Sequence, residues 1–214
     1  MPEVIETTVY TFEELDERAQ ERARDWYRQA SAHDDWYEFV FEDFERICEI
    51  LGVDLATRPV RLHGGGTRQK PCIWFSGFAS QGDGACFEGS YSYLKGASRA
   101  IRAYAPRDMW LAAIADQLQR IQRRNLYALE ARLTHRGRYD HEHSMEISVE
   151  RSSDRDQPPT ADAEDGVSEA LRDLARWLYR QLEQEYDHQM SNEVVDEGII
   201  ANWYTFTEAG SRFG

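Results

Sequence analysis

The sequence predicts an α+β fold, in which a mainly antiparallel sheet of four to six strands is covered on one face by helices. Two hydrophobic periods support this fold class. Apolar residues recur at helical spacing over 15–30 and over 167–182, whereas they alternate with polar residues over 139–150. Hydrophobic residues make up 41% of the chain, with 6 Trp, 11 Tyr and 9 Phe, so the chain can bury a core.

The N-terminal region predicts two consecutive helices. Thr11 and Glu14 have the spacing of a capping box, in which each side chain satisfies an otherwise unpaired amide, and an apolar stripe follows from Leu15. A second amphipathic helix begins near Asp34 and ends at Gly52. Because few residues join the two helices, we expect an N-terminal αα-hairpin.

The middle of the chain predicts strands and turns. Segments 72–79 and 85–93 are expected to form a hairpin, because Asp83-Gly84 between them favours the positive φ of a tight turn. The other predicted elements are a strand around Val60, helical segments at 97–104, after Pro106, over 167–182 and from Asn192, and strands over 139–150 and 202–206.

We predict one domain over 1–214, with a mobile loop at 151–165. The loop is polar, contains two consecutive prolines and lacks apolar periodicity. No apolar run approaches the roughly 20 residues of a membrane helix, and the first nine residues lack a signal-peptide pattern. We therefore expect a cytoplasmic protein without a membrane partner.

Charge is segregated along the chain, whose net charge is −14. Residues 1–56 carry −11, residues 57–138 carry +9 and residues 139–214 carry −12. These blocks could pair within the fold, or they could leave an acidic face that repels nucleic acid and attracts basic proteins. The charge pattern alone leaves both interpretations open.

Several residues could carry chemistry. Asp83 and Glu88 could act as an acid/base pair, although their glycine-rich surroundings also suit simple turn geometry. His141 and His143 lie two apart on a predicted strand, so both could bind one metal ion, with His135 or Cys86 completing the site. The same face is apolar, so a pair of core histidines is the competing interpretation. No cofactor is predicted.

Two further candidates come from the cysteines and arginines. Cys48, Cys72 and Cys86 lack any C-x-x-C spacing, so we expect free buried thiols, with Cys86 as a nucleophile the alternative. The basic cluster that could contact RNA comprises Arg120, Arg123, Arg124, Arg132, Arg136 and Arg138. The overall negative charge opposes that contact.

Three stretches carry a family resemblance: 9–15 with 23–27, 75–89 and 204–210. The most specific of them contains Ser-Gln-Gly-Asp-Gly-Ala-Cys-Phe-Glu-Gly at 80–89. Together they resemble a family of small proteins from phages, prophages and their bacterial hosts, whose members are commonly labelled as hypothetical or as the antitoxin of a toxin–antitoxin system. The resemblance implies a mobile-element protein that binds another macromolecule, and it transfers no catalytic residue.

We therefore predict a non-enzymatic binding protein that neutralises a toxin or a bacterial antiviral effector through a basic surface on that protein target. Carboxylates can occupy sites that normally hold phosphates, so the protein would mimic nucleic acid and would not bind it directly. The residues expected to contact the target are Asp34, Asp35, Glu38, Glu42, Asp43, Glu45 and Glu49, with Gln81 and Asp83 at the hairpin tip. The alternatives are a metal-dependent hydrolase using Asp83, Glu88, His141 and His143, and an RNA-binding regulator.

Overall fold

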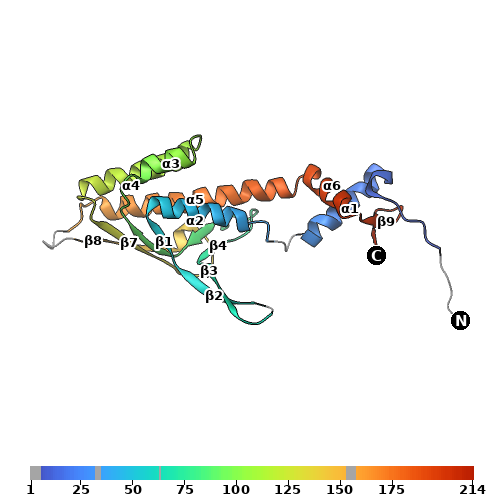
Figure 1. Cartoon of the computed structure of the whole chain (residues 1–214), viewed down its shortest axis with the longest axis horizontal. Coiled ribbons are helices and arrows are strands. Elements are labelled where there is room, and N and C mark those ends of the chain that lie inside the picture. Colours follow the sequence, from blue (N-terminus) through green and yellow to red (C-terminus); the bar gives the residue numbers. More distant parts are fainter. Residues whose placement is uncertain (1–5, 32–34, 63, 153–157) are drawn as a thin grey trace. The chain divides into compact units, whose positions relative to one another are not determined.

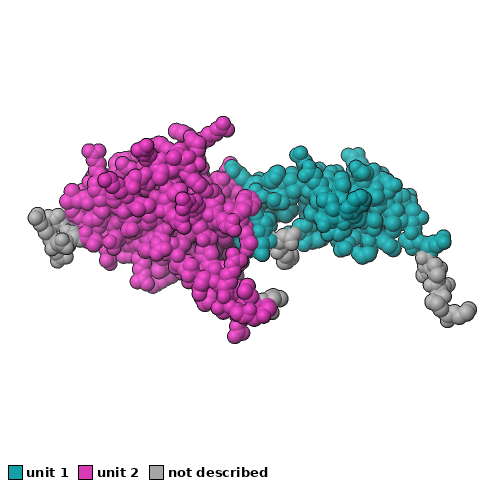
Figure 2. Space-filling view, in the orientation of Figure 1, with its two compact units in different colours: residues 1–37, 184–214 teal, residues 38–183 magenta. Residues whose placement is uncertain are grey.

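A computed structural model describes residues 6–31, 35–62, 64–152 and 158–214 (Figure 1). The chain divides into two compact units (Figure 2). Unit 1 comprises Met1–Tyr37 and Gln184–Gly214, and unit 2 comprises Glu38–Glu183. Whether the two units fold as the single domain predicted over 1–214 stays a prediction, since compactness does not decide how they fold.

Unit 2 contains a four-stranded antiparallel sheet in the order β1-β6-β7-β8. Its strands are β1 (Val53–Leu55), β6 (Gly89–Ser92), β7 (Leu129–His135) and β8 (Met145–Arg151). The helices of this unit are α2 (Glu38–Leu51), α3 (Ala97–Tyr104), α4 (Met109–Arg124) and most of α5 (Ala163–Gln189). The predicted α+β fold with a mainly antiparallel sheet is confirmed.

Strand alternation separates the two faces of this sheet. One row across the four strands consists of Val53, Tyr91, Ala131 and Val149, all buried. The adjacent row, Asp54, Ser90, Arg132 and Ser148, is exposed throughout. Helices lie over the buried face (Figure 1). Phe44 of α2 helps to join the layers, because its ring contacts Phe87 at 5.3 Å and Trp177 of α5 at 6.5 Å between centroids.

Two shorter strand pairs extend unit 2, and both are antiparallel. One pairs β2 (Thr57–Arg61) with β3 (Thr67–Pro71), and the other pairs β4 (Ile73–Phe75) with β5 (Ala85–Phe87). The sequence predicts one return strand over 85–93, but the structure divides it at Glu88, so that β5 pairs with β4 while β6 pairs with β1 and β7. Tertiary packing explains this break, because a Cβ on Gly89 would lie 2.1 Å from the carbonyl oxygen of Asp54.

A second strand also differs from its prediction. The alternating segment 139–150 becomes a strand only from Met145, since Glu142–Ser144 form a 3₁₀ turn, η2. Local hydrogen bonds replace the sheet ladder here: the His143 amide donates to His141 Nδ1 at 3.2 Å, and the Ser144 hydroxyl donates to the His141 carbonyl at 2.6 Å. His141 and His143 therefore do not share a strand face.

Unit 1 is built from η1 (Phe12–Glu14), α1 (Glu17–Ser31), α6 (Asn192–Ala201) and a small hairpin of β9 (Thr205–Phe206) and β10 (Arg212–Phe213). The predicted capping box is present, but it caps the N-terminus of η1 and not that of α1. The helix α1 begins two residues after Leu15, where the Asp16 carboxylate accepts a hydrogen bond from the Ala19 amide at 2.8 Å. The two consecutive N-terminal helices are α1 and α2, as expected, and they belong to different units.

The core of unit 1 is rich in aromatic residues. Phe206 is fully buried against Phe12, with ring centroids 6.5 Å apart, and against Trp26 at 6.0 Å. The guanidinium of Arg212 lies 4.9 Å from the rings of both Trp26 and Tyr204. Residues from both ends of the chain thus meet in one cluster.

Among the described residues, no helix is both long enough and apolar enough to cross a membrane. Of the predicted loop at 151–165, residues 153–157 lie outside the described residues. The strand β8 extends through Arg151, and α5 begins at Ala163.

Replacing Phe206 with alanine should destabilise unit 1 by about 3–5 kcal/mol, because it removes a fully buried ring. Phe213→Ala on the same hairpin is the matched control, since its residue is 44% exposed and its loss should cost less than about 1 kcal/mol. Urea unfolding followed by tryptophan fluorescence measures both variants. Equal losses of stability would contradict the assignment of Phe206 to the core.

Candidate functional site

The acidic residues of α2 lie on a partly neutralised face. Glu38 forms an ion pair with Lys70 at 3.3 Å, and Glu49 forms one with Arg46 of the same helix at 2.6 Å. Asp43 accepts a hydrogen bond from the Tyr104 hydroxyl. Groups of the central segment therefore engage two of the predicted contact residues, Glu38 and Asp43, and Arg46 of the same helix engages a third, Glu49. The first two are the internal pairing that the charge pattern left open.

The remaining acids of this set differ in exposure. Asp35 is exposed and accepts the Tyr37 hydroxyl at 3.1 Å, whereas Asp34 lies outside the described residues. Glu42 is exposed and Glu45 is half-buried. Burial raises the pKa of Glu45, and repulsion from Glu42 and Glu49 raises it further, while Arg68 lowers it. Glu42, Glu45 and Glu49 thus form a stripe of like charges along α2, which we call the α2 stripe.

The hairpin tip is held by Asp83. Its carboxylate accepts the amides of Ala79 at 2.9 Å and Ser80 at 2.6 Å, and its own amide donates to the Ser80 carbonyl at 3.0 Å. Asp83 therefore has a turn-forming role, and Gln81 is exposed beside it. The predicted positive φ at Asp83-Gly84 is wrong, since neither residue is among those with positive φ.

Gly84 is required for space. A Cβ at this position would lie 2.8 Å from Cδ2 and 3.0 Å from Cα of His141. The Ser76 hydroxyl links the same two segments, because it accepts the Gly84 amide at 3.0 Å and donates to the Asp140 carbonyl at 3.3 Å. The segment after β7 is therefore packed tightly against the β4–β5 hairpin.

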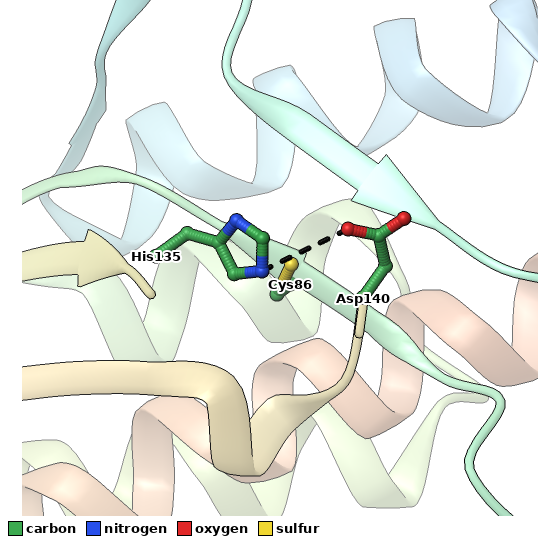
Figure 3. Close-up of side chains that lie close together, drawn as sticks. All are labelled: Cys86, His135 and Asp140. Carbon is green, nitrogen blue, oxygen red and sulfur yellow. Dashed lines mark ion pairs between the residues drawn. The ribbon is translucent and has the colours of Figure 1, made fainter. Parts of the chain in front are cut away.

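This packing brings together three side chains from separate segments: Cys86 of β5, His135 at the end of β7, and Asp140 in the following loop (Figure 3). Their ligand atoms all lie within 4.8 Å of one another. Nε2 of His135 is 3.7 Å from Oδ1 of Asp140 and 3.0 Å from the Tyr139 carbonyl oxygen. The donor set is a thiol, an imidazole and a carboxylate, the groups that bind zinc in proteins.

The environment of this trio limits its chemistry. Cys86 is fully buried, and burial raises the pKa of its thiol to about 12. A hydrogen bond with Ser144 lowers that pKa in part, and the nearby Asp140 raises it. A buried, protonated thiol is a poor nucleophile, so the geometry opposes the alternative of Cys86 as a catalytic nucleophile.

A second group consists of His141, Glu142 and His143. Glu142 faces both histidines, at 3.0 Å from His141 Nδ1 and 3.8 Å from His143 Nε2. Its carboxylate also pairs with Arg176 of α5 at 3.2 Å. The guanidinium already supplies the positive charge that a metal ion would bring, so this group is better described as an ion-pair network.

The four residues of the predicted hydrolase do not converge among the described residues. Asp83 holds its turn, Glu88 accepts the His135 amide at 2.9 Å, and neither belongs to a group of potential metal ligands with His141 and His143. The sequence names Cys86 and His135 as completing ligands, but it gives no signal for Asp140. Only the path of the loop between β7 and η2 places that carboxylate.

The arginines proposed for RNA binding are also engaged in part. Arg124 pairs with Asp162 at 2.5 Å, and Arg136 pairs with Glu146 at 3.2 Å. Arg120 and Arg124 line a pocket that also contains Asp162 and Asp165. Carboxylates in the same pocket oppose phosphate binding there.

Comparison with known families gives one match. The model of a family described as a domain of unknown function (DUF8835) matches residues 36–192. The chain belongs to this family. The matched range contains all of unit 2, and with it Cys86, His135, Asp140 and the α2 stripe. No curated protein and no solved structure matches the chain.

Gly84→Ala should destabilise the protein by about 1–3 kcal/mol, because the added methyl group overpacks against the backbone and ring of His141. Gly82→Ala is the matched control, since a Cβ there meets nothing within 4 Å. Thermal unfolding compares the two. The same melting temperature for both variants would show that the loop after β7 does not pack on the hairpin.

Proposed function

We propose that this protein is a non-enzymatic acidic binding protein from a mobile element, and that it neutralises a toxin or a bacterial antiviral effector by protein–protein contact. The observation that carries the proposal is a surplus of carboxylates that is unevenly distributed. Unit 1 has 16 acidic and 5 basic residues, a net charge of −11, whereas unit 2 has 23 acidic and 20 basic residues, a net charge of −3.

The bases of unit 1 do not offset this surplus. Arg24 pairs with Glu21 and Asp196 at 3.0 and 2.6 Å, and Arg28 reaches Glu21 and Asp25 at 3.4 and 3.3 Å. Two more are used within the unit, since Arg22 donates to the Ala209 carbonyl and Arg212 lies over aromatic rings. The other carboxylates of unit 1 supply a field that attracts a basic partner.

In unit 2 the α2 stripe is the surface best suited to contact such a partner. Residues at i, i+3 and i+7 share one helix face. Burial raises the pKa of Glu45, and repulsion from Glu42 and Glu49 adds to that effect. Cationic side chains of a partner would relieve that repulsion. A surface that normally binds phosphates presents such cations, which is why a toxin or effector that acts on nucleic acid fits the proposal.

The resemblance to phage and prophage proteins labelled as antitoxins supports the same context. Asp43, Glu38 and Asp83 are weaker proposed contacts, since each already has a partner within unit 2, and Glu49 shares this feature through its ion pair with Arg46. Gln81 at the exposed hairpin tip remains a proposed contact outside the α2 stripe.

The partner is identified by capture from bacterial hosts that carry toxin and defence systems, with washes at low and high salt and mass spectrometry of the bound fraction. Its affinity is then measured with purified proteins. We expect Glu42→Lys, Glu45→Lys and Glu49→Lys together to abolish binding, because three attractive contacts become repulsive. Added duplex DNA should compete with the wild-type protein for the partner.

The matched control reverses three exposed carboxylates on the open face of the sheet, in Asp54→Lys, Glu130→Lys and Glu150→Lys. Its change in net charge is identical, so a loss confined to the α2 variant assigns the contact to α2. Circular dichroism verifies that both variants fold. Unchanged affinity in the α2 variant, or binding that is insensitive to salt, would rule out the electrostatic mechanism.

A further inference from the structure

The side chains of Cys86, His135 and Asp140 are spaced as the ligands of a small cation. With the bond lengths that zinc makes to sulfur, nitrogen and oxygen, a tetrahedral site holds its ligand atoms about 3.3–3.6 Å apart. The 3.7 Å separation of His135 Nε2 and Asp140 Oδ1 is close to that range, and all three ligand atoms lie within 4.8 Å of one another. A shortening of these separations by at most about 1.5 Å would bring the three atoms around an ion.

The arrangement is convergent, which distinguishes it from a catalytic relay. In a nucleophile–histidine–acid triad, the nucleophile and the acid contact different ring nitrogens. Here the sulfur of Cys86 and a carboxylate oxygen of Asp140 both lie within 4.8 Å of one and the same ring nitrogen of His135 (Figure 3). Three ligand atoms that point at one volume can coordinate a metal ion, but they cannot pass a proton along a chain.

We propose that Cys86, His135 and Asp140 form a zinc-binding site that fastens the loop after β7 to the β4–β5 hairpin. The mixed thiolate, imidazole and carboxylate set favours zinc over magnesium or calcium, which prefer oxygen ligands. Three protein ligands leave a fourth tetrahedral position for water. On binding, the Cys86 thiol loses its proton to solvent. Nε2 of His135 gives up the hydrogen bond that it donates to the Tyr139 carbonyl at 3.0 Å, and the neutral ring then carries its proton on Nδ1 so that Nε2 can bind the metal.

Neighbouring groups orient these ligands. The Trp74 ring is stacked on the His135 ring with centroids 5.2 Å apart, and Glu88 accepts the His135 amide at 2.9 Å. The Ser76 hydroxyl holds the backbone of Asp140 at 3.3 Å. Such outer contacts reduce the entropy lost when the ligands close around an ion.

Access also suits a cation. The Asp140 side chain is 32% exposed and the His135 side chain 15% exposed, whereas Cys86 is fully buried. The ion therefore enters past Asp140. By contrast, Glu142 of the His141–Glu142–His143 group forms an ion pair with Arg176 at 3.2 Å, and the positive charge of this guanidinium repels a metal ion.

The test titrates zinc into the purified full chain in competition with a chromophoric chelator, after measuring the metal content of the protein as isolated. Cobalt(II) replaces zinc in a parallel experiment, in which a thiolate-to-cobalt charge-transfer band reports coordination by sulfur. We expect one zinc per chain and the thiolate band. Asp140→Asn should weaken zinc binding by about 100-fold or more, since loss of a ligand exceeds the effect of losing an outer contact.

Two matched controls complete the test. Cys72→Ser removes another buried thiol, and His143→Ala removes a ligand candidate of the second group; both should retain zinc and the thiolate band. Asp140→Asn is the decisive variant, because its side chain is partly exposed and its fold can be verified by circular dichroism. Absence of competitive zinc binding by the wild-type protein would overturn the proposal. Loss of zinc in His143→Ala but not in Asp140→Asn would overturn it as well.

Discussion

Close packing at Gly84 is the constraint on which the candidate metal site depends. There is no room for a side chain at this position, because a Cβ would lie 2.8 Å from the His141 ring. The contact holds the segment after β7 against the β4–β5 hairpin, with the Ser76 hydroxyl bonded to both. Cys86 follows two residues later on the hairpin, His135 ends β7, and Asp140 lies on the packed segment. Without this approach Asp140 would be separate from the other two potential ligands.

Segments of opposite charge that are separate along the chain fold into the same unit. The basic central segment and the acidic α2 belong to the same unit, where Lys70, Tyr104 and Arg68 lie beside the acids of the helix. The chain termini form the other unit and leave their acids in large excess over their bases. Part of the charge segregation is therefore neutralised within unit 2, whereas unit 1 retains its acidic surplus.

Local sequence signals predicted local structure well. Alternation in 145–150, the capping residues Thr11 and Glu14, and the amphipathic pattern of α2 all correspond to elements of the structure. The errors arise where distant segments decide the backbone. The strand over 85–93 is divided because Gly89 meets β1, and the strand over 139–150 starts late because local hydrogen bonds form η2. Asp140 could not be found from sequence, since its position depends on the loop that links β7 to η2.

X-ray absorption at the zinc edge of the zinc-loaded protein tests the convergence of Cys86, His135 and Asp140 most directly. The proposed site should show one sulfur ligand at about 2.3 Å together with nitrogen and oxygen ligands at about 2.0 Å. The sulfur shell should disappear in Cys86→Ser and persist in Cys72→Ser. A coordination shell that contains only nitrogen and oxygen in the wild-type protein would contradict the proposed site.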